Sequence, residues 1–110
     1  LRALVLTVHS LEQVKLIEPE LFLAISRVAR EVNCLHFEPF GFQVSDLGPA
    51  TRAHSEFMVK NGLNQNFVAA LTEAARRYGL RASFMATELF LPLHSDNPTS
   101  LAIWHSHNPA

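Results

Sequence analysis

The sequence has 110 residues, of which 48% are hydrophobic and 17% are charged, and its formal net charge is −1. This length suits one α/β domain, 1–110, and the near-neutral charge excludes a general electrostatic attraction to nucleic acid or to an anionic membrane surface. The single cysteine excludes an intrachain disulfide and any multi-cysteine metal motif, so we expect a reducing, cytoplasmic setting, and no apolar run reaches the roughly 20 residues that cross a bilayer.

The first half of the chain predicts two strands with helices between them. Residues 1–8 are almost continuously apolar, as in a strand that is covered on both faces. A short helix over 11–18 follows, and the helical spacing of apolar residues predicts a longer helix from Glu20 to Val32. Cys34 to Val44 indicates a second strand, in which a proline and a glycine favour a sheet edge or a bulge.

The second half begins with two predicted helices, each closed by a glycine. One helix runs from Pro49 to the pair Asn61-Gly62, and the other follows Asn66 and ends at Gly79. Glycine at these positions favours a stop because it adopts the left-handed conformation that often follows a helix.

Two strands, over 80–93 and 101–107, are predicted to close the chain as an antiparallel hairpin. A polar loop over 94–100 joins them, and this length predicts Leu93 opposite Leu101. The whole order β-α-α-β-α-α-β-β predicts a two-layer α/β (α+β) sandwich with a mixed four-stranded sheet. Whether the helices cover one face or both is left open by the sequence.

A pair of histidines near the end of the chain suggests a metal site. Alternation along a strand places His105 and His107 on one face, about 6.6 Å apart along the strand, so that both imidazoles could bind one divalent metal ion. A third ligand would have to come from another strand, and the candidates are His9, His36 and Glu38. With a neighbouring carboxylate or histidine as general base, such a set would form a metal-dependent hydrolase.

The same segment resembles part of a known motif. His105, Ser106 and His107 resemble the zinc-binding His-Ser-His-Pro stretch of the JAMM-type metallopeptidases, and Asn108 stands where that motif has proline. The resemblance implies zinc chemistry at the two histidines. It covers three residues and identifies no family.

The lone cysteine is predicted to be structural. Cys34 and His36 alternate onto one face of the second strand, about 7 Å apart along it, which is beyond hydrogen-bond reach. We therefore expect a buried thiol that packs as a small hydrophobic group rather than a thiolate–imidazole pair.

The low charge favours a surface that is partly covered by another protein. Phe40, Phe42 and Val44 fall at the expected sheet edge, and Trp104 lies in the closing hairpin, so we predict an interface at these residues. The leading hypothesis is a binding or regulatory domain that acts as a homo-oligomer or with a protein partner. A metal-dependent hydrolase and a small-molecule-binding domain are the alternatives, with no nucleic acid and no membrane involved in any of them.

Overall fold

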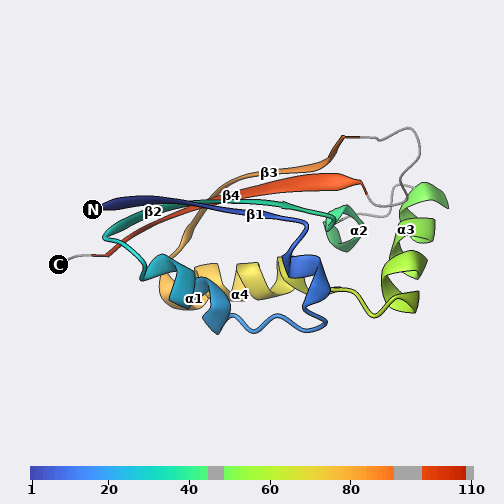
Figure 1. Cartoon of the computed structure of the whole chain (residues 1–110), viewed down its shortest axis with the longest axis horizontal. Coiled ribbons are helices and arrows are strands. Elements are labelled where there is room, and N and C mark those ends of the chain that lie inside the picture. Colours follow the sequence, from blue (N-terminus) through green and yellow to red (C-terminus); the bar gives the residue numbers. More distant parts are fainter. Residues whose placement is uncertain (45–48, 91–97, 109–110) are drawn as a thin grey trace.

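The computed structural model describes residues 1–44, 49–90 and 98–108. Its four strands form one mixed sheet in the order β1-β2-β4-β3, as Figure 1 shows. β1 runs parallel to β2, whereas β4 is antiparallel to both of its neighbours, β2 and β3. The predicted mixed four-stranded α/β fold is thus confirmed. The strands are β1 (Arg2–Val8), β2 (Glu31–Glu38), β3 (Arg81–Phe90) and β4 (Thr99–His107).

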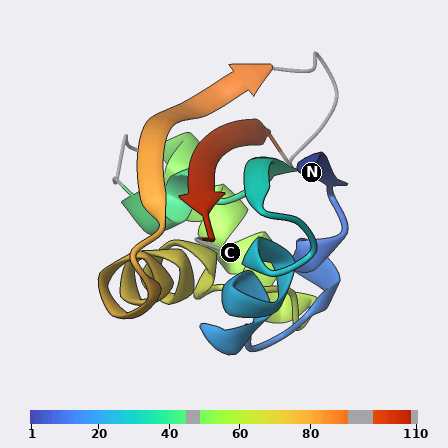
Figure 2. The same ribbon diagram turned by 90° about the vertical axis from the view of Figure 1, so that its left-hand side faces the viewer.

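The helices cover one face of the sheet and leave the other uncovered, which answers the question that the sequence left open. Helices α1 and α4 lie together under the sheet in both ribbon views (Figures 1 and 2). Burial alternates accordingly along β2 and β4, where every second side chain turns towards the helices and is buried. The helical elements are η1 (Leu11–Gln13), α1 (Glu20–Ser26), α2 (Gly41–Val44), α3 (Pro49–Lys60) and α4 (Phe67–Tyr78).

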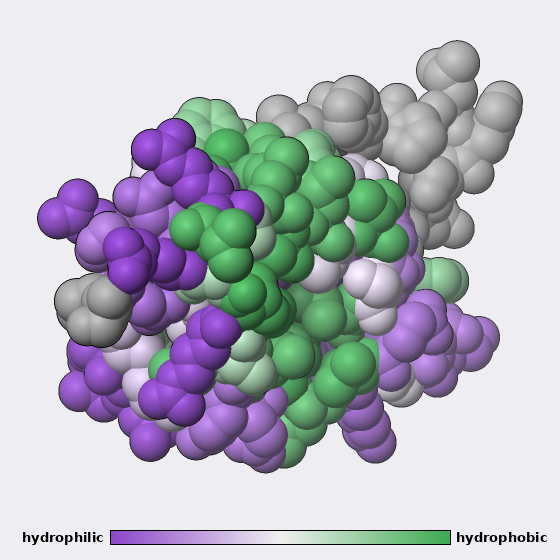
Figure 3. Space-filling view, turned by 60° about the vertical axis from the view of Figure 1, so that its left-hand side comes forward, coloured by the Kyte–Doolittle hydropathy of each residue, from purple (hydrophilic) through white to green (hydrophobic). Residues whose placement is uncertain are grey.

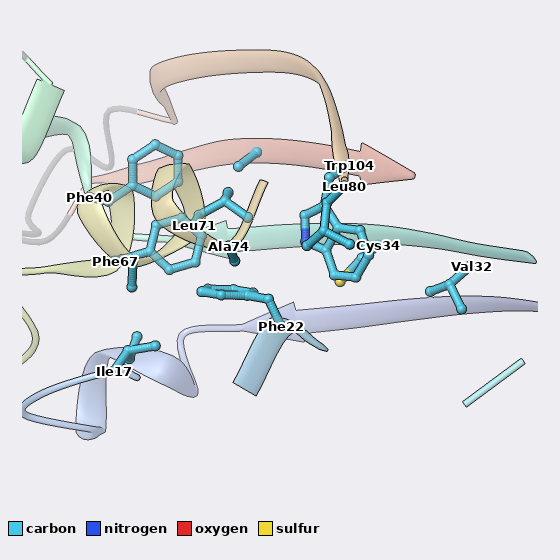
Figure 4. Packing of buried hydrophobic residues seen from close by; sticks show 12 residues of the cluster. Ile17, Phe22, Val32, Cys34, Phe40, Phe67, Leu71, Ala74, Leu80 and Trp104 are labelled. Atoms are coloured by element: carbon cyan, nitrogen blue, oxygen red, sulfur yellow. The ribbon is translucent and has the colours of Figure 1, made fainter. Parts of the chain in front are cut away.

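The hydrophobic core lies between the sheet and this helical layer. Phe67 of α4 is central to it, because its ring stacks on Phe40 with centroids 4.9 Å apart and meets the edge of Phe22 at 5.9 Å. Trp104 is the largest fully buried side chain, and Figure 4 shows it beside Cys34. The predicted apolar stripe of α4 therefore faces the sheet, and the helix ends at Gly79, which has φ 69°.

The predicted helix from Glu20 to Val32 is wrong in its second half. α1 ends at Ser26, and β2 has begun by Glu31. The Nδ2 group of Asn108 donates to the carbonyl oxygens of Ser26 and Ala29, and so satisfies groups that a continuing helix would have used internally. The stop is thus fixed by a residue about eighty positions away.

The predicted strand from Cys34 to Val44 is also too long. β2 ends at Glu38, and residues 41–44 form the short helix α2. Pro39 offers no backbone N–H for a ladder, and Phe40 turns inward to stack on Phe67. Burial of this aromatic ring draws the segment away from the sheet.

The predicted helix over 11–18 is one 3-10 turn, Leu11–Gln13. Beyond it the backbone is extended at Val14, whose carbonyl oxygen accepts a hydrogen bond from Asn64 at 2.8 Å. Asn66 similarly binds both backbone groups of Ile17. These two asparagines hold the segment against α4 in place of a helix.

The hairpin register differs from the predicted pairing of Leu93 with Leu101. Ala86 is opposite Leu101, and the ladder shifts between Ala82 and Phe84 and again between Ala86 and Phe90. Each irregularity changes the register, which sequence length alone did not reveal. Leu93 itself lies outside the described residues. Within the described ranges, no helix has the length and apolarity that a membrane crossing requires.

Candidate functional site

The two terminal histidines lie on the uncovered side of the sheet, at its polar end. His105 Nδ1 is 3.0 Å from Asn33 Oδ1, and His107 Nδ1 is 3.3 Å from Glu31 Oε1. Glu31 also pairs with Arg2 of β1 at 2.7 Å. The histidines thus share one side of β4, as predicted, and each faces a polar group of the neighbouring strand β2.

None of the candidate third ligands joins them. His36 and Glu38 belong to the buried alternation of β2, which faces the helices on the opposite side of the sheet. His9 follows β1, where its Nε2 lies 2.7 Å from Thr99 Oγ1. Among residues 1–44, 49–90 and 98–108, no three histidine, cysteine or acidic side chains come close enough to hold a metal ion. Alternation and strand order thus place these three candidates on the other face or at the other end of the sheet, away from His105 and His107 of the same chain.

A buried polar chain runs through the core beside the only cysteine. Trp104 Nε1 donates to His36 Nε2 at 2.8 Å, and His36 Nδ1 lies 2.7 Å from Thr7 Oγ1. Because an indole N–H only donates, Nε2 must be the unprotonated nitrogen and Nδ1 must carry the proton. The sulfur of Cys34 lies 3.3 Å from the same Nε2, so the prediction that Cys34 and His36 are out of reach is wrong.

This contact does not make a reactive thiolate. Burial raises the pKa of the Cys34 thiol to about 12 and lowers the pKa of His36 to about 4. Both groups are therefore neutral near pH 7, and neither is accessible to solvent. The predicted structural role of Cys34 agrees with these surroundings.

A second polar group gathers where β1 and β2 end. Glu38 is buried and accepts hydrogen bonds from the backbone N–H groups of Ser10 at 3.3 Å and Leu11 at 3.1 Å. Burial raises the pKa of Glu38, although hydrogen bonds from Thr7 and Ser10 oppose the rise. A cavity of about 10 Å³ lies beside this carboxyl group. It is the size of one water molecule and too small for a substrate.

A shallow groove between α4 and the outer strand β3 is the larger of the two hollows in the described part of the chain that bear on the small-molecule alternative. Its volume is about 250 Å³, and its lining is largely apolar. This is below the roughly 300–1,000 Å³ of most ligand pockets, and the groove supplies few polar groups to orient a ligand. The lining residues are Leu71, Ala82, Ser83, Phe84, Met85, Ala102 and Ile103.

The predicted interface residues divide into buried and accessible groups. Phe40 and Trp104 are buried in the core, so they cannot form the surface expected of them. Phe42 is half-buried and meets the edge of the His54 ring at 5.0 Å. Val44 is exposed, but it belongs to α2 rather than to a strand. Only part of that prediction therefore describes accessible surface.

Another surface carries the exposed apolar residues of the sheet. Among the side chains that the structure describes, eight large apolar ones lie in neighbouring positions on the side of the sheet without helices, and we call this side the open face. Figure 3 shows a continuous hydrophobic band on the molecule, bordered on both sides by hydrophilic residues. By strand register the open face consists of Leu4, Leu6 and Val8 on β1, Leu35 and Phe37 on β2, Leu101 and Ile103 on β4, and Phe84 on β3.

Exposure on the open face lies at its two edges, with Phe84 52% exposed on β3 and a row of three exposed side chains on β1. Leu4, Leu6 and Val8 are 67%, 54% and 63% exposed, whereas the apolar residues of β2 and β4 on this face shield one another and are only partly accessible. We refer to these three residues of β1 as the β1 surface. The β1 surface was not predicted, because the apolar run over 1–8 indicated a strand covered on both faces, whereas every second residue of β1 is exposed.

Comparisons with known proteins do not add to this geometry. No family model matches the sequence, and no curated protein or solved structure gives a significant match.

Proposed function

We propose that this protein is a binding module that self-associates, with a second copy of the chain docking on the β1 surface. The observation that carries the proposal is the row of three apolar side chains, each more than half exposed, along the edge strand β1. Water-exposed leucine and valine side chains gain free energy when a partner covers them. A contiguous row of such apolar side chains on a water-exposed surface is typical of an interaction site.

The charge of the chain suits a second copy as the occupant. The net charge of −1 produces almost no repulsion between two copies. On this side of β1 and β2 the charged residues, Arg2 and Glu31, pair with each other at the end of the strands rather than within the apolar row. A second copy therefore meets an uncharged surface that matches its own.

The exposed area predicts a weak dimer rather than a permanent one. The β1 surface and its immediate neighbours offer on the order of 400–500 Å² per copy, or roughly 800–1,000 Å² in total, which is below the size of standard specific interfaces. Interfaces of this size commonly belong to transient complexes, so we expect a dissociation constant in the micromolar range.

The test compares two leucines of nearly equal exposure. Leu4 is 67% exposed on the β1 surface, and Leu16 is 64% exposed in the connection before α1. Sedimentation or light scattering at increasing concentration should show dimers for the wild type and for Leu16→Glu. Leu4→Glu should raise the dissociation constant at least about tenfold, because it places a carboxylate in the contact.

Circular dichroism checks that both variants remain folded. A wild-type chain that stays monomeric at millimolar concentration would refute self-association. Equal weakening by Leu4→Glu and Leu16→Glu would refute the β1 surface as its location.

A further inference from the structure

The backbone of β1 has one paired side and one free side. Leu1 accepts from the N–H of Glu31 at 3.2 Å, and His9 donates to the carbonyl oxygen of Phe37 at 2.8 Å. Because both backbone groups of a strand residue point to the same side, and successive residues alternate, the odd-numbered residues of β1 pair with β2. The even-numbered residues direct their N–H and C=O groups to the free edge.

The same residues therefore present two kinds of contact. Leu4, Leu6 and Val8 expose apolar side chains on the open face and unpaired backbone groups at the edge. A partner that pairs with the backbone at this edge, and places its own side chains beside these, must be an extended strand.

The two edges of the sheet differ in how they resist such pairing. β3, the other outer strand, has two register shifts in its ladder, and bulges of this kind protect an edge against a further strand. β1 pairs with β2 over seven consecutive residues without a shift. It contains no proline or glycine, and its only charged residue is Arg2 at the start. Only β1 therefore has the regular edge that strand addition needs.

We infer that two copies join by antiparallel pairing of β1 with β1, centred on Val5, to give one continuous eight-stranded sheet. This inference rests on the proposed function and specifies its geometry. A two-fold axis brings the same strand from each copy together only in the antiparallel direction. Centring on Val5 pairs the strand along its whole length, with Leu4 opposite Leu6 of the second copy.

In this register all even-numbered residues of β1 form hydrogen-bonded pairs, about eight backbone hydrogen bonds in all. The two Arg2 side chains lie at opposite ends of the seam, roughly 20 Å apart, so they do not repel each other strongly. Hydrogen bonding of the free edge supplements an apolar area that is small for a stable dimer.

Disulfide trapping tests the register. Val5 faces Val5 of the second copy in a non-hydrogen-bonded pair, with Cα atoms about 4.5 Å apart, within the range that a disulfide bridges. Val5→Cys should form a covalent dimer under mild oxidation by oxidised glutathione. Val8→Cys is the matched control. It is more exposed, but the two copies of residue 8 lie about 20 Å apart along the seam and should not cross-link.

The native Cys34 is buried and should give no background. Cross-linking through Val8→Cys but not Val5→Cys would overturn the strand pairing while leaving self-association intact, since it would mean that open faces stack on each other. No dimer in any assay would refute the proposed function as well.

A backbone substitution gives a second readout. The N–H of Leu6 points to the free edge, so Leu6→Pro removes an intermolecular donor without breaking the ladder to β2. Leu6→Ala shortens the side chain and keeps the donor. Strand pairing predicts that Leu6→Pro weakens the dimer at least about tenfold more than Leu6→Ala. Equal weakening by the two variants would overturn the pairing.

Discussion

Acidification should destabilise the fold through one buried histidine. His36 is fully buried, and its Nε2 accepts the indole N–H of Trp104. Protonation would place two N–H groups against each other in an environment without water. Burial lowers the pKa of His36 to about 4, whereas its ordinary value is 6.5. The unfolded chain therefore binds a proton at this position over a pH range in which the folded chain does not.

The sign and size of the change in stability follow from this difference between the folded and unfolded pKa of His36. A depressed folded-state pKa leaves stability unaffected above pH 6.5 and reduces it progressively as the pH falls towards 4. The loss should be about 2 kcal/mol at pH 5 and about 3 kcal/mol at pH 4. Such a loss is large beside the 5–15 kcal/mol typical of a whole domain.

Urea unfolding at several pH values measures this loss, and the only tryptophan, Trp104, supplies the fluorescence signal. Glu38 contributes in the opposite direction, because its raised pKa favours the folded state at low pH. Subtracting the unfolding free energy of His36→Gln from that of the wild type at each pH cancels the contribution of Glu38, which both proteins share. The wild type's stability advantage over the variant should shrink by about 3 kcal/mol between pH 7.5 and pH 4. A difference that stays constant to within about 0.5 kcal/mol would refute the reasoning.

Two further predictions concern buried polar side chains. Cys34 should resist a thiol reagent at pH 8 in the folded protein and react at once in urea, because its thiol is buried and has a pKa of about 12; rapid labelling of the native chain would contradict the burial. Asn64→Ala should lower the free energy of unfolding by about 2–3 kcal/mol. The Nδ2 group of Asn64 donates to the carbonyl oxygen of Val14, and its Oδ1 accepts from the N–H of Phe67 at the start of α4. Asn61→Ala is the exposed control and should cost about 0.5 kcal/mol or less in the same unfolding assay; equal costs would show that the buried network contributes little.

Local signals predicted the helices of the second half well. Pro49 begins α3, and Gly79 ends α4 in the left-handed conformation. Both residues act through their own backbone geometry, which does not depend on the rest of the fold. By contrast, the end of α1 depends on Asn108, and the course of residues 14–17 depends on Asn64 and Asn66. Contacts between distant parts of the chain leave no local pattern.

The candidate site could be predicted only in part for a related reason. The apolar residues of β1 were recognised, but an apolar run has the same sequence whether both of its faces are covered or one is left open. The one-sided helical layer decides between these cases, and it follows from the tertiary packing of α1 and α4. For the histidines, alternation correctly placed His105 and His107 together. The position of His9 depended on strand order, and that of Glu38 on which face of the sheet the helices cover.

The position of β4 has a consequence for how the chain folds. β4 is the last strand in sequence, yet it lies inside the sheet, between β2 and β3. Its register joins His36 to Ala102, so a loop of more than sixty residues must close before β2 gains its second neighbour. Until β4 is in place, β3 has no partner strand, and only the β1-β2 pair can form. Folding should therefore be slow for a domain of this size, and during synthesis the sheet can be completed only after the segment Thr99–His107 has left the ribosome.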